Sequence, residues 1–278
     1  MTALHTLRTE GLVSGYGRTT IVDDVDVEIP AGRICVIVGA NACGKSTLLK
    51  TISRLIPAQA GAVILDGERI DRMPTKDLAR TLGLLPQQPV APEGIAVADL
   101  VGRGRHPHQK LFRSWTADDD RAVAEALTAT GVLDLSDRAV DELSGGQRQR
   151  VWIAMALAQE TDILLLDEPT TFLDVSHQVE VLDLLTDLNA SRGTTIVMVL
   201  HDINLAARYA DHLFALKKGR VVANGPPSEV VTSELVRDVF DLDSLVIPDP
   251  VSGTPLVLPR GRHRTLPHPG ATPSGGLR

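Results

Sequence analysis

A glycine-bearing segment between an apolar run and an amphipathic run constrains the fold of this chain more than any other feature of the sequence. Residues 39–46 read Gly-Ala-Asn-Ala-Cys-Gly-Lys-Ser and fit the pattern G-x-x-x-x-G-K-[ST]. The apolar run before them, residues 33–39, predicts a buried strand, and Leu48 and Ile52 after them predict a helix. Backbone N–H groups of such a turn wrap phosphate oxygens, and the helix N-terminus adds partial positive charge. A nucleoside triphosphate is therefore the expected ligand.

The side chains of this loop have separate expected roles. Lys45 is expected to bind the β- and γ-phosphates, Ser46 to ligate Mg²⁺, and Thr47 to contact the α-phosphate. A plain turn with a surface lysine is the alternative, and the strand and helix on either side argue against it. The expected nucleotide-binding residues here are Gly39, Asn41, Ala42, Cys43, Gly44, Lys45, Ser46 and Thr47.

Two adjacent carboxylates follow a second apolar run. Residues 162–167 read DILLLD, and Asp167 is followed by Glu168. Asp167 suits a role in holding Mg²⁺ and its water molecules. Glu168 can act as the general base for an attacking water, a contribution typically of about 10²- to 10⁴-fold. Together with the phosphate loop, the pair indicates metal-assisted hydrolysis of a nucleoside triphosphate.

The apolar runs also predict the fold class. Residues 33–39, 162–167 and 194–200 are apolar almost throughout, which is typical of parallel strands covered by helices on both faces. Apolar and acidic residues alternate over 25–29, and residues 62–65 run into Asp66-Gly67, a hairpin-turn signal. We therefore expect an α/β core with an antiparallel β-portion near the N-terminus.

A long helical stretch separates the first two apolar runs. Within residues 89–160, residues 118–130 begin with acidic side chains and stop at Gly131, and Ser144 can cap a further helix. We expect a mostly helical insertion into the core. From residue 260 the chain is rich in Pro, Gly, Arg and His without periodicity, which predicts disorder.

Composition narrows the class of protein. The 278 residues are 43% hydrophobic and 23% charged, as in ordinary globular proteins. A net charge of -7 and a pI near 5.6 argue against nucleic acid as a partner. No apolar run approaches the roughly 18 residues of a membrane helix, and no signal-peptide pattern begins the chain. We expect a cytoplasmic chain with incidental thiols at Cys35 and Cys43, which acts at a membrane only through a partner.

Residues 143–147 read Leu-Ser-Gly-Gly-Gln and lie upstream of the acidic pair. A serine-capped helix start with two glycines offers N–H groups and a hydroxyl to an anion. With this motif the chain resembles the ATP-binding cassette (ABC) family over residues 7–248. The resemblance implies ATP as the nucleotide and a P-loop NTPase (RecA-like) core with an N-terminal antiparallel β-subdomain and an inserted helical subdomain. In that family the motif, here Ser144, Gly145, Gly146 and Gln147, meets the γ-phosphate held by a second copy in a head-to-tail dimer.

The resemblance assigns roles to further residues. Tyr16 resembles the aromatic residue that stacks on adenine. Gln87 resembles the glutamine that reaches Mg²⁺ and the lytic water, Asp174 the loop that aligns the two subunits, and His201 the switch histidine on the γ-phosphate. Expected catalytic residues are Glu168, His201 and Gln87, and expected Mg²⁺ ligands are Ser46, Gln87 and Asp167.

The resemblance extends to domains and partners. It implies an ABC ATPase domain at residues 1–248, with the helical subdomain at 89–160, and a C-terminal extension at 249–278. Residues 84–104 and 170–178 resemble ATPases of ferric-siderophore importers, with cobalamin and haem importers as close alternatives. Such a subunit sits at the cytoplasmic face of the cell membrane beneath integral-membrane permease subunits, which are fed by an extracytoplasmic substrate-binding protein. Permease helices are expected to dock near Gln87, in the groove between the core and the helical insertion.

Two other classes share part of the pattern. A soluble ABC ATPase of DNA repair, translation or iron-sulfur assembly carries the same catalytic motifs, but neither a second cassette nor a coiled-coil insertion is evident. A P-loop kinase has no use for LSGGQ or for a glutamate after Asp167. The phosphate loop departs from the common form at Ala40, where Pro is frequent, and at Ala42, where Gly is frequent. If position 42 needs a positive φ, its alanine costs about 1 kcal/mol.

Overall fold

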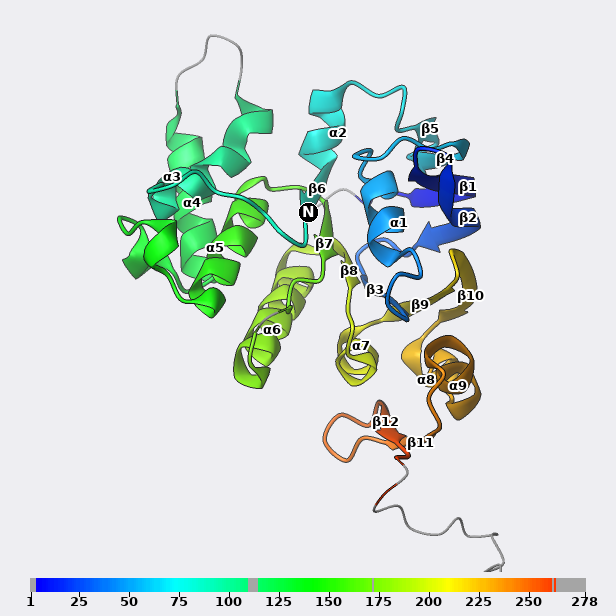
Figure 1. Ribbon diagram of the computed structural model, residues 1–278. Helices are drawn as coiled ribbons and strands as arrows, with labels where there is room; N and C mark the ends of the chain where they lie inside the picture. Colours follow the sequence, from blue (N-terminus) through cyan, green and yellow to red (C-terminus); the bar gives the residue numbers. More distant parts are fainter. Residues whose placement is uncertain (1–3, 110–114, 172, 262, 264–278) are drawn as a thin grey trace, which may run out of the picture.

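A six-stranded mixed sheet lies at the centre of the computed structural model, which describes residues 4–109, 115–171, 173–261 and 263 (Figure 1). The strand order is β10-β9-β3-β8-β7-β6, and all neighbours are parallel except the antiparallel pair β9 and β10. The strands are β3 (Ile34–Gly39), β6 (Leu82–Leu85), β7 (Ile163–Asp167), β8 (Thr195–Val199), β9 (His212–Lys217) and β10 (Arg220–Gly225). The three apolar runs form β3, β7 and β8, and every residue of these strands is buried, which confirms the prediction.

A second sheet of four antiparallel strands packs beside the first, in the order β2-β1-β4-β5. Its strands are β1 (Leu7–Tyr16), β2 (Thr19–Ile29), β4 (Ala60–Leu65) and β5 (Glu68–Arg69). Asp66 and Gly67 form the turn between β4 and β5 with φ of 52° and 83°. The positive φ at both positions is that of a tight hairpin turn, as the sequence predicts.

Helix α1 (Lys45–Ile52) lies between the two sheets, where Leu48, Leu49 and Ile52 are buried. Side chains of the central sheet alternate between two cores. Cys35 and Ile37 pack with α1 and the antiparallel sheet, whereas Val36 and Val38 pack with helices on the opposite face. The two cores fix the end of β3 and the start of α1, so the loop between them is anchored on both sides.

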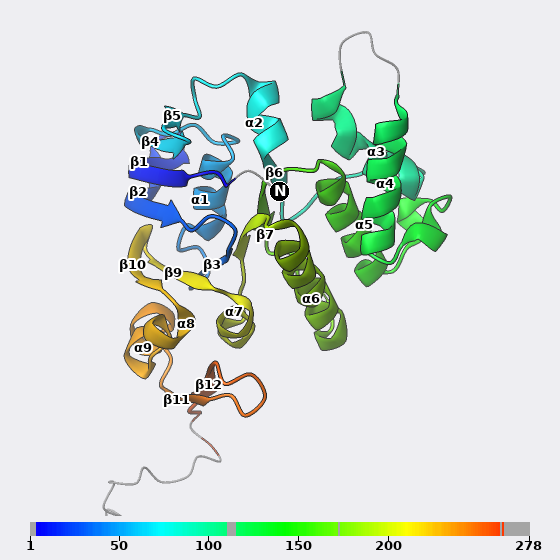
Figure 2. The ribbon, with the colours of Figure 1, turned by 180° about the vertical axis from the view of Figure 1, so that it is seen from behind.

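Most of the remaining helices cover the opposite face or form a separate lobe, whereas α2 packs in the same core as α1 through Leu78. Figures 1 and 2 show α3, α4 and α5 together on the side of the central sheet away from the antiparallel sheet. The lobe contains α3 (Val97–Gly102), η1 (Arg103–His108), α4 (Ala117–Ala129), η2 (Leu133–Leu135), η3 (Val140–Glu142) and α5 (Gly145–Ala158). The others are α2 (Thr75–Thr81), α6 (Val175–Arg192), α7 (Ile203–Tyr209), α8 (Pro227–Val230) and α9 (Ser233–Phe240). Helices α4 and α5 confirm the two helices predicted in this stretch.

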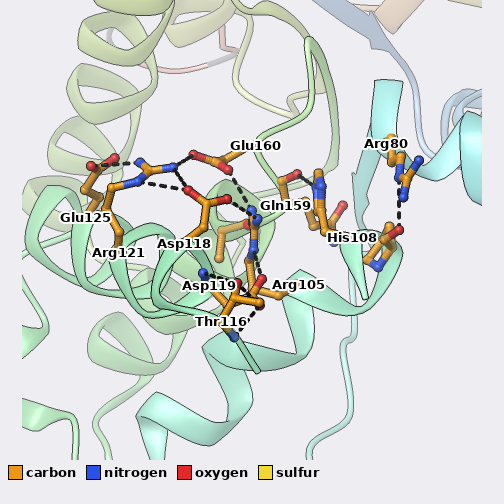
Figure 3. Close-up of polar contacts among 12 residues, drawn as sticks. Arg80, Arg105, His108, Thr116, Asp118, Asp119, Arg121, Glu125, Gln159 and Glu160 are labelled. Carbon is orange, nitrogen blue, oxygen red and sulfur yellow. Dashed lines mark hydrogen bonds and ion pairs between the residues drawn. The ribbon is translucent and has the colours of Figure 1, made fainter. Parts of the chain in front are cut away.

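A buried arginine joins three parts of the lobe (Figure 3). Arg105 of η1 is 2% exposed, and its Nε donates to Oδ1 of Asp119 at 2.9 Å. Its Nη1 donates to the backbone oxygen of Ala158 at 2.9 Å and to Oε2 of Glu160 at 2.7 Å. Since Ala158 ends α5 and Asp119 lies in the first turn of α4, one guanidinium fixes the two helices to η1.

A hairpin of β11 (Ser244–Pro248) and β12 (Pro255–Pro259) follows α9 and was not predicted from the sequence. The side chain of Asn204 in α7 bonds to both backbone groups of Val257, which holds the hairpin against the core. Most of the segment predicted to be disordered from residue 260, namely 262 and 264–278, lies outside the described residues. In the part of the chain that the structure describes, no helix combines the length and apolar character of a membrane span.

Candidate nucleotide site

Residues from six parts of the chain line one cavity of about 520 Å³ at the carboxyl ends of the parallel strands. Ligands of open α/β sheets bind at this edge. The lining residues are Tyr16, Ile21, Asn41, Ala42, Cys43, Gly44, Lys45, Ser46, Thr47, Gln87, Glu168 and His201. All of these except Ile21 belong to the nucleotide-binding or catalytic residues expected from the sequence.

The loop from Gly39 to the start of α1 has positive φ angles at two glycines and at one alanine. Gly39 has a φ of 154°, and a Cβ at this position would lie 2.3 Å from the backbone oxygen of Leu216. Ala42 has a φ of 60°, so this alanine adopts the left-handed conformation that the sequence analysis considered. The ammonium of Lys45 lies over the loop and donates to the backbone oxygens of Gly39 at 2.9 Å and Ala40 at 3.0 Å.

Ser46 and Asp167 meet at the base of this loop. The Ser46 hydroxyl donates to Oδ1 of Asp167 at 2.7 Å. Burial raises the pKa of the Asp167 carboxyl, and the bond from Ser46 offsets this only in part. The other oxygen, Oδ2, is buried and has no hydrogen-bond partner among the described residues. A buried acceptor without a partner is costly, so this oxygen is suited to a cation.

Glu168 is contacted from two other segments and from its own turn. Its side chain is 8% exposed, and Oε1 lies 2.5 Å from Nε2 of His201. Its Oε2 accepts from Nε2 of Gln87 at 2.5 Å and from the hydroxyl of Thr171 at 3.0 Å. Glu168 has a φ of 56°, a strained conformation for a non-glycine residue that is common at functional sites. Its carboxylate is thus held in one orientation toward the cavity.

Thr171 also contacts Glu168, and this contact was not predicted from the sequence. The available signal was its position three residues after the glutamate, in the turn that follows β7. A hydroxyl at that spacing can reach back to the carboxylate because Thr171 N also bonds to the backbone oxygen of Glu168 at 3.2 Å.

The residues of the LSGGQ motif do not line this cavity. Ser144 caps α5, since its hydroxyl accepts from the backbone N of Gln147 while the Gln147 side chain accepts from the backbone N of Ser144. Asp174 also lies outside the cavity and caps α6. Its pKa falls to about 2 because it accepts hydrogen bonds from His177 N, Ser176 Oγ and the His177 ring.

The fold and this cavity define a P-loop nucleoside triphosphatase, the fold class expected from the sequence. The family model described as "ABC transporter" matches residues 22–171, more than half of the chain. The chain therefore belongs to the ABC transporter family, and it is an ATPase of that family.

Two curated relatives are similar over nearly the whole chain. The ferric enterobactin transport ATP-binding protein FepC of Escherichia coli (strain K12) is 54% identical over 92% of this chain and 94% of its own. The "Probable siderophore transport system ATP-binding protein YusV" of Bacillus subtilis (strain 168) is 52% identical over 98% of this chain and 99% of its own.

Two solved structures have the same fold. The structure of cbiO1 from Clostridium perfringens, part of the ABC transporter complex cbiONQ, has a TM-score of 0.73 and 30% identity, covering 85% of this chain and 94% of its own. The dimeric structure of MJ0796, a bacterial ABC transporter cassette, has a TM-score of 0.70 and 28% identity, covering 79% of this chain and 98% of its own.

Proposed function

We propose that this chain is the ATP-hydrolysing subunit of an importer for ferric siderophores. The observation that carries the proposal is a cavity lined by the expected nucleotide-binding and catalytic residues, in a chain 52% identical to YusV over 98% of its length. The names of YusV and FepC specify siderophore and ferric enterobactin transport. In this proposal the cargo passes through the permease and does not touch this chain. The identity of the cargo is therefore supported by the likeness to these relatives and not by the cavity.

The residues around the cavity divide the work of hydrolysis. Tyr16, which is 55% exposed at the end of β1, is placed to stack on adenine. The phosphate loop binds the triphosphate through its backbone N–H groups and Lys45. Glu168 accepts a proton from the attacking water, while Gln87 and His201 hold its carboxylate.

The donor set beside the loop fits Mg²⁺. Ser46, Gln87 and Asp167 would hold the ion, and oxygen donors of this kind are those that Mg²⁺ prefers. The buried Oδ2 of Asp167, which lacks a hydrogen-bond partner within the described ranges, supports the assignment. When bound, the ion neutralises charge that develops on the phosphate oxygens.

The site is completed by a second copy of the chain. Ser144, Gly145, Gly146 and Gln147 begin a helix with an exposed capping box, and they lie outside the chain's own cavity. In a head-to-tail dimer they contact the γ-phosphate bound by the partner, and Asp174 lies at the contact between the subunits. The dimeric structure of MJ0796 supports such an assembly.

The division of the chain follows the same proposal. Residues 1–248 form the ABC ATPase domain with the helical subdomain at 89–160, and 249–278 form a C-terminal extension. Gln87 follows β6 where the chain enters the helical lobe, so a permease docked in the groove beside it influences the contact with Glu168. The ATPase dimer lies on the cytoplasmic face of the cell membrane, and a substrate-binding protein delivers cargo on the other side.

The proposal is tested in the native host. A tagged chain should copurify with membrane permeases, and Glu168→Gln should abolish ferric-siderophore uptake at an unchanged protein level. Glu234→Gln, an exposed position on α9, is the matched control and should leave uptake intact. Recovery of soluble proteins alone, or a selective loss of haem or cobalamin uptake, would contradict siderophore import.

A further inference from the structure

The first half of α5 contacts the segment after Glu168 at one position and the start of α6 at two. Nε2 of Gln149 donates to the backbone oxygen of Pro169 at 2.7 Å, and Arg150 pairs with Glu180. At the first turn of α5, Gly146 faces the ring of His177. These contacts join the helix that carries the LSGGQ motif to the segment that follows Glu168.

The contact between Gly146 and His177 is close enough that a Cβ at position 146 would have to displace the ring by a few tenths of an ångström. A Cβ at position 146 would lie 3.0 Å from Cδ2 of His177 and 3.3 Å from both Cγ and Nε2. A Cβ at the neighbouring Gly145 would meet no atom within 4 Å. Gly146 has no positive φ within α5, so an alanine at this position would be opposed by the ring of His177 and not by backbone strain.

The same imidazole is held on its other side by Asp174. Nδ1 of His177 lies 2.6 Å from Oδ1 of Asp174, which also accepts from His177 N at 3.0 Å and from Ser176 Oγ at 2.9 Å. Gln178 donates from Nε2 to the backbone oxygen of Leu173 at 3.0 Å and so fixes the segment before Asp174. One ring therefore links the LSGGQ loop to Asp174 within the same chain.

We propose that His177 is a positioning residue, which fixes the LSGGQ loop relative to Asp174 so that the two segments meet the second copy as one unit. The inference rests on the proposed head-to-tail dimer. In that dimer, Glu168 serves the chain's own nucleotide, whereas Gly146 serves the partner's. Because Asp174 and Pro169 belong to the segment after Glu168, the contact at His177 also links the two nucleotide sites.

The test uses the full chain carrying Glu168→Gln, in which ATP should produce a stable dimer. Adding His177→Ala should raise the ATP concentration for half-maximal dimerisation by about tenfold, within the range of couplings between contacting residues. Binding of a fluorescent ATP analogue to the monomer should change by less than about twofold, because His177 does not line the cavity. Light scattering on a sizing column and fluorescence titration give the two values.

The steric contact has its own test with a matched control. Gly146→Ala should raise the ATP concentration for half-maximal dimerisation by roughly fivefold or more when His177 is present. In the His177→Ala background the same substitution should raise it by about twofold or less. Gly145→Ala should show the same effect in both backgrounds. If Glu168→Gln stays monomeric with ATP, the proposed dimer is wrong and this inference with it. If it dimerises and His177→Ala changes neither its ATP dependence nor the effect of Gly146→Ala, only this inference is wrong.

Discussion

Nε2 of His201 lies 2.5 Å from Oε1 of Glu168. Glu168 directly follows β7, and His201 lies just after β8. Because β7 and β8 are neighbouring parallel strands, the two side chains meet at one edge of the sheet. The histidine side chain is 46% exposed, whereas that of the glutamate is 8% exposed. The ring therefore lies on the open side of a carboxylate that the protein otherwise encloses.

His201→Ala should lower kcat for ATP hydrolysis by about 10²-fold, because Glu168, the proposed general base, loses the group that orients one of its oxygens. KM should change little, since the phosphate loop is untouched. Steady-state hydrolysis assays of the purified chain measure both constants. His108→Ala is the control, because His108 bonds to the backbone oxygen of Gln159 in the helical lobe. An unchanged kcat for His201→Ala would remove His201 from the catalytic site.

The alanine at position 42 stores strain that glycine would relieve. With a φ of 60°, Ala42 costs about 1 kcal/mol, partly offset by the greater freedom of glycine in the unfolded chain. Ala42→Gly should therefore raise the unfolding temperature by about 1 to 3 °C. Ala40→Gly, in the same loop but without a positive φ, should lower it or leave it unchanged. Scanning calorimetry without nucleotide compares them, and an equal effect of both substitutions would contradict the role of φ.

The parts of the site that the sequence predicts are those whose chemistry depends on local spacing. Lys45 and Ser46 begin the helix after a buried strand, and Asp167 ends and Glu168 follows a strand that is otherwise apolar. Their meeting follows from the parallel sheet, because the carboxyl ends of its strands share one edge. The structure brings these residues together as expected.

The contacts that the sequence does not predict depend on packing between distant segments. In the sequence, Arg105 lies in a polar stretch and has no feature that predicts burial. In the structure its side chain is 2% exposed, because it packs between α4 and α5. The hairpin of β11 and β12 is held by Asn204, which precedes Val257 by 53 residues. Neither contact leaves a periodic pattern, because it depends on tertiary placement and not on the spacing of apolar residues.

Arg105→Met should destabilise the chain strongly, because it leaves Asp119 without its guanidinium partner in the interior of the lobe. Loss of one partner of a buried ion pair typically costs about 3 to 5 kcal/mol. Arg121→Met is the matched control, since Arg121 pairs with Asp118 and Glu125 on an exposed surface, where ion pairs contribute little. Urea unfolding of the two variants measures the difference. Equal midpoints would show that burial of Arg105 does not matter for stability.

His5 joins the antiparallel sheet to the central sheet through two carboxylates. Its Nδ1 lies 2.6 Å from Oδ2 of Asp66, in the turn after β4, and its Nε2 lies 3.0 Å from Oδ2 of Asp162, just before β7. Burial lowers the pKa of His5, but the bonds and charges of Asp66 and Asp162 outweigh it, and the pKa is raised above its ordinary 6.5. For Asp66, burial acts in the opposite direction and raises the pKa. The hydrogen bonds from His5 and Thr6 outweigh burial, and the pKa of Asp66 is below its ordinary 3.8.

These shifts define a pH window for the contact. Because the pKa of His5 is raised on folding, its stabilisation is complete below pH 6.5 and is lost as the pH rises through the folded value. Because the pKa of Asp66 is lowered, its stabilisation is complete above pH 3.8 and is lost in stronger acid. The contact is therefore most stabilising between these two values. Thermal unfolding followed by circular dichroism at several pH values detects the change.

His5→Gln should lower the unfolding temperature by about 2 °C near pH 6 and by less at about pH 8.5, because the stabilisation from the raised pKa of His5 is lost as the pH rises through the folded value. Asp71→Asn is the control. Asp71 pairs with Arg69 in the same sheet, and neither group titrates in this range, so its effect should be the same at both pH values. A difference between native chain and His5→Gln that does not vary with pH would show that His5 acts through packing and not through its charge.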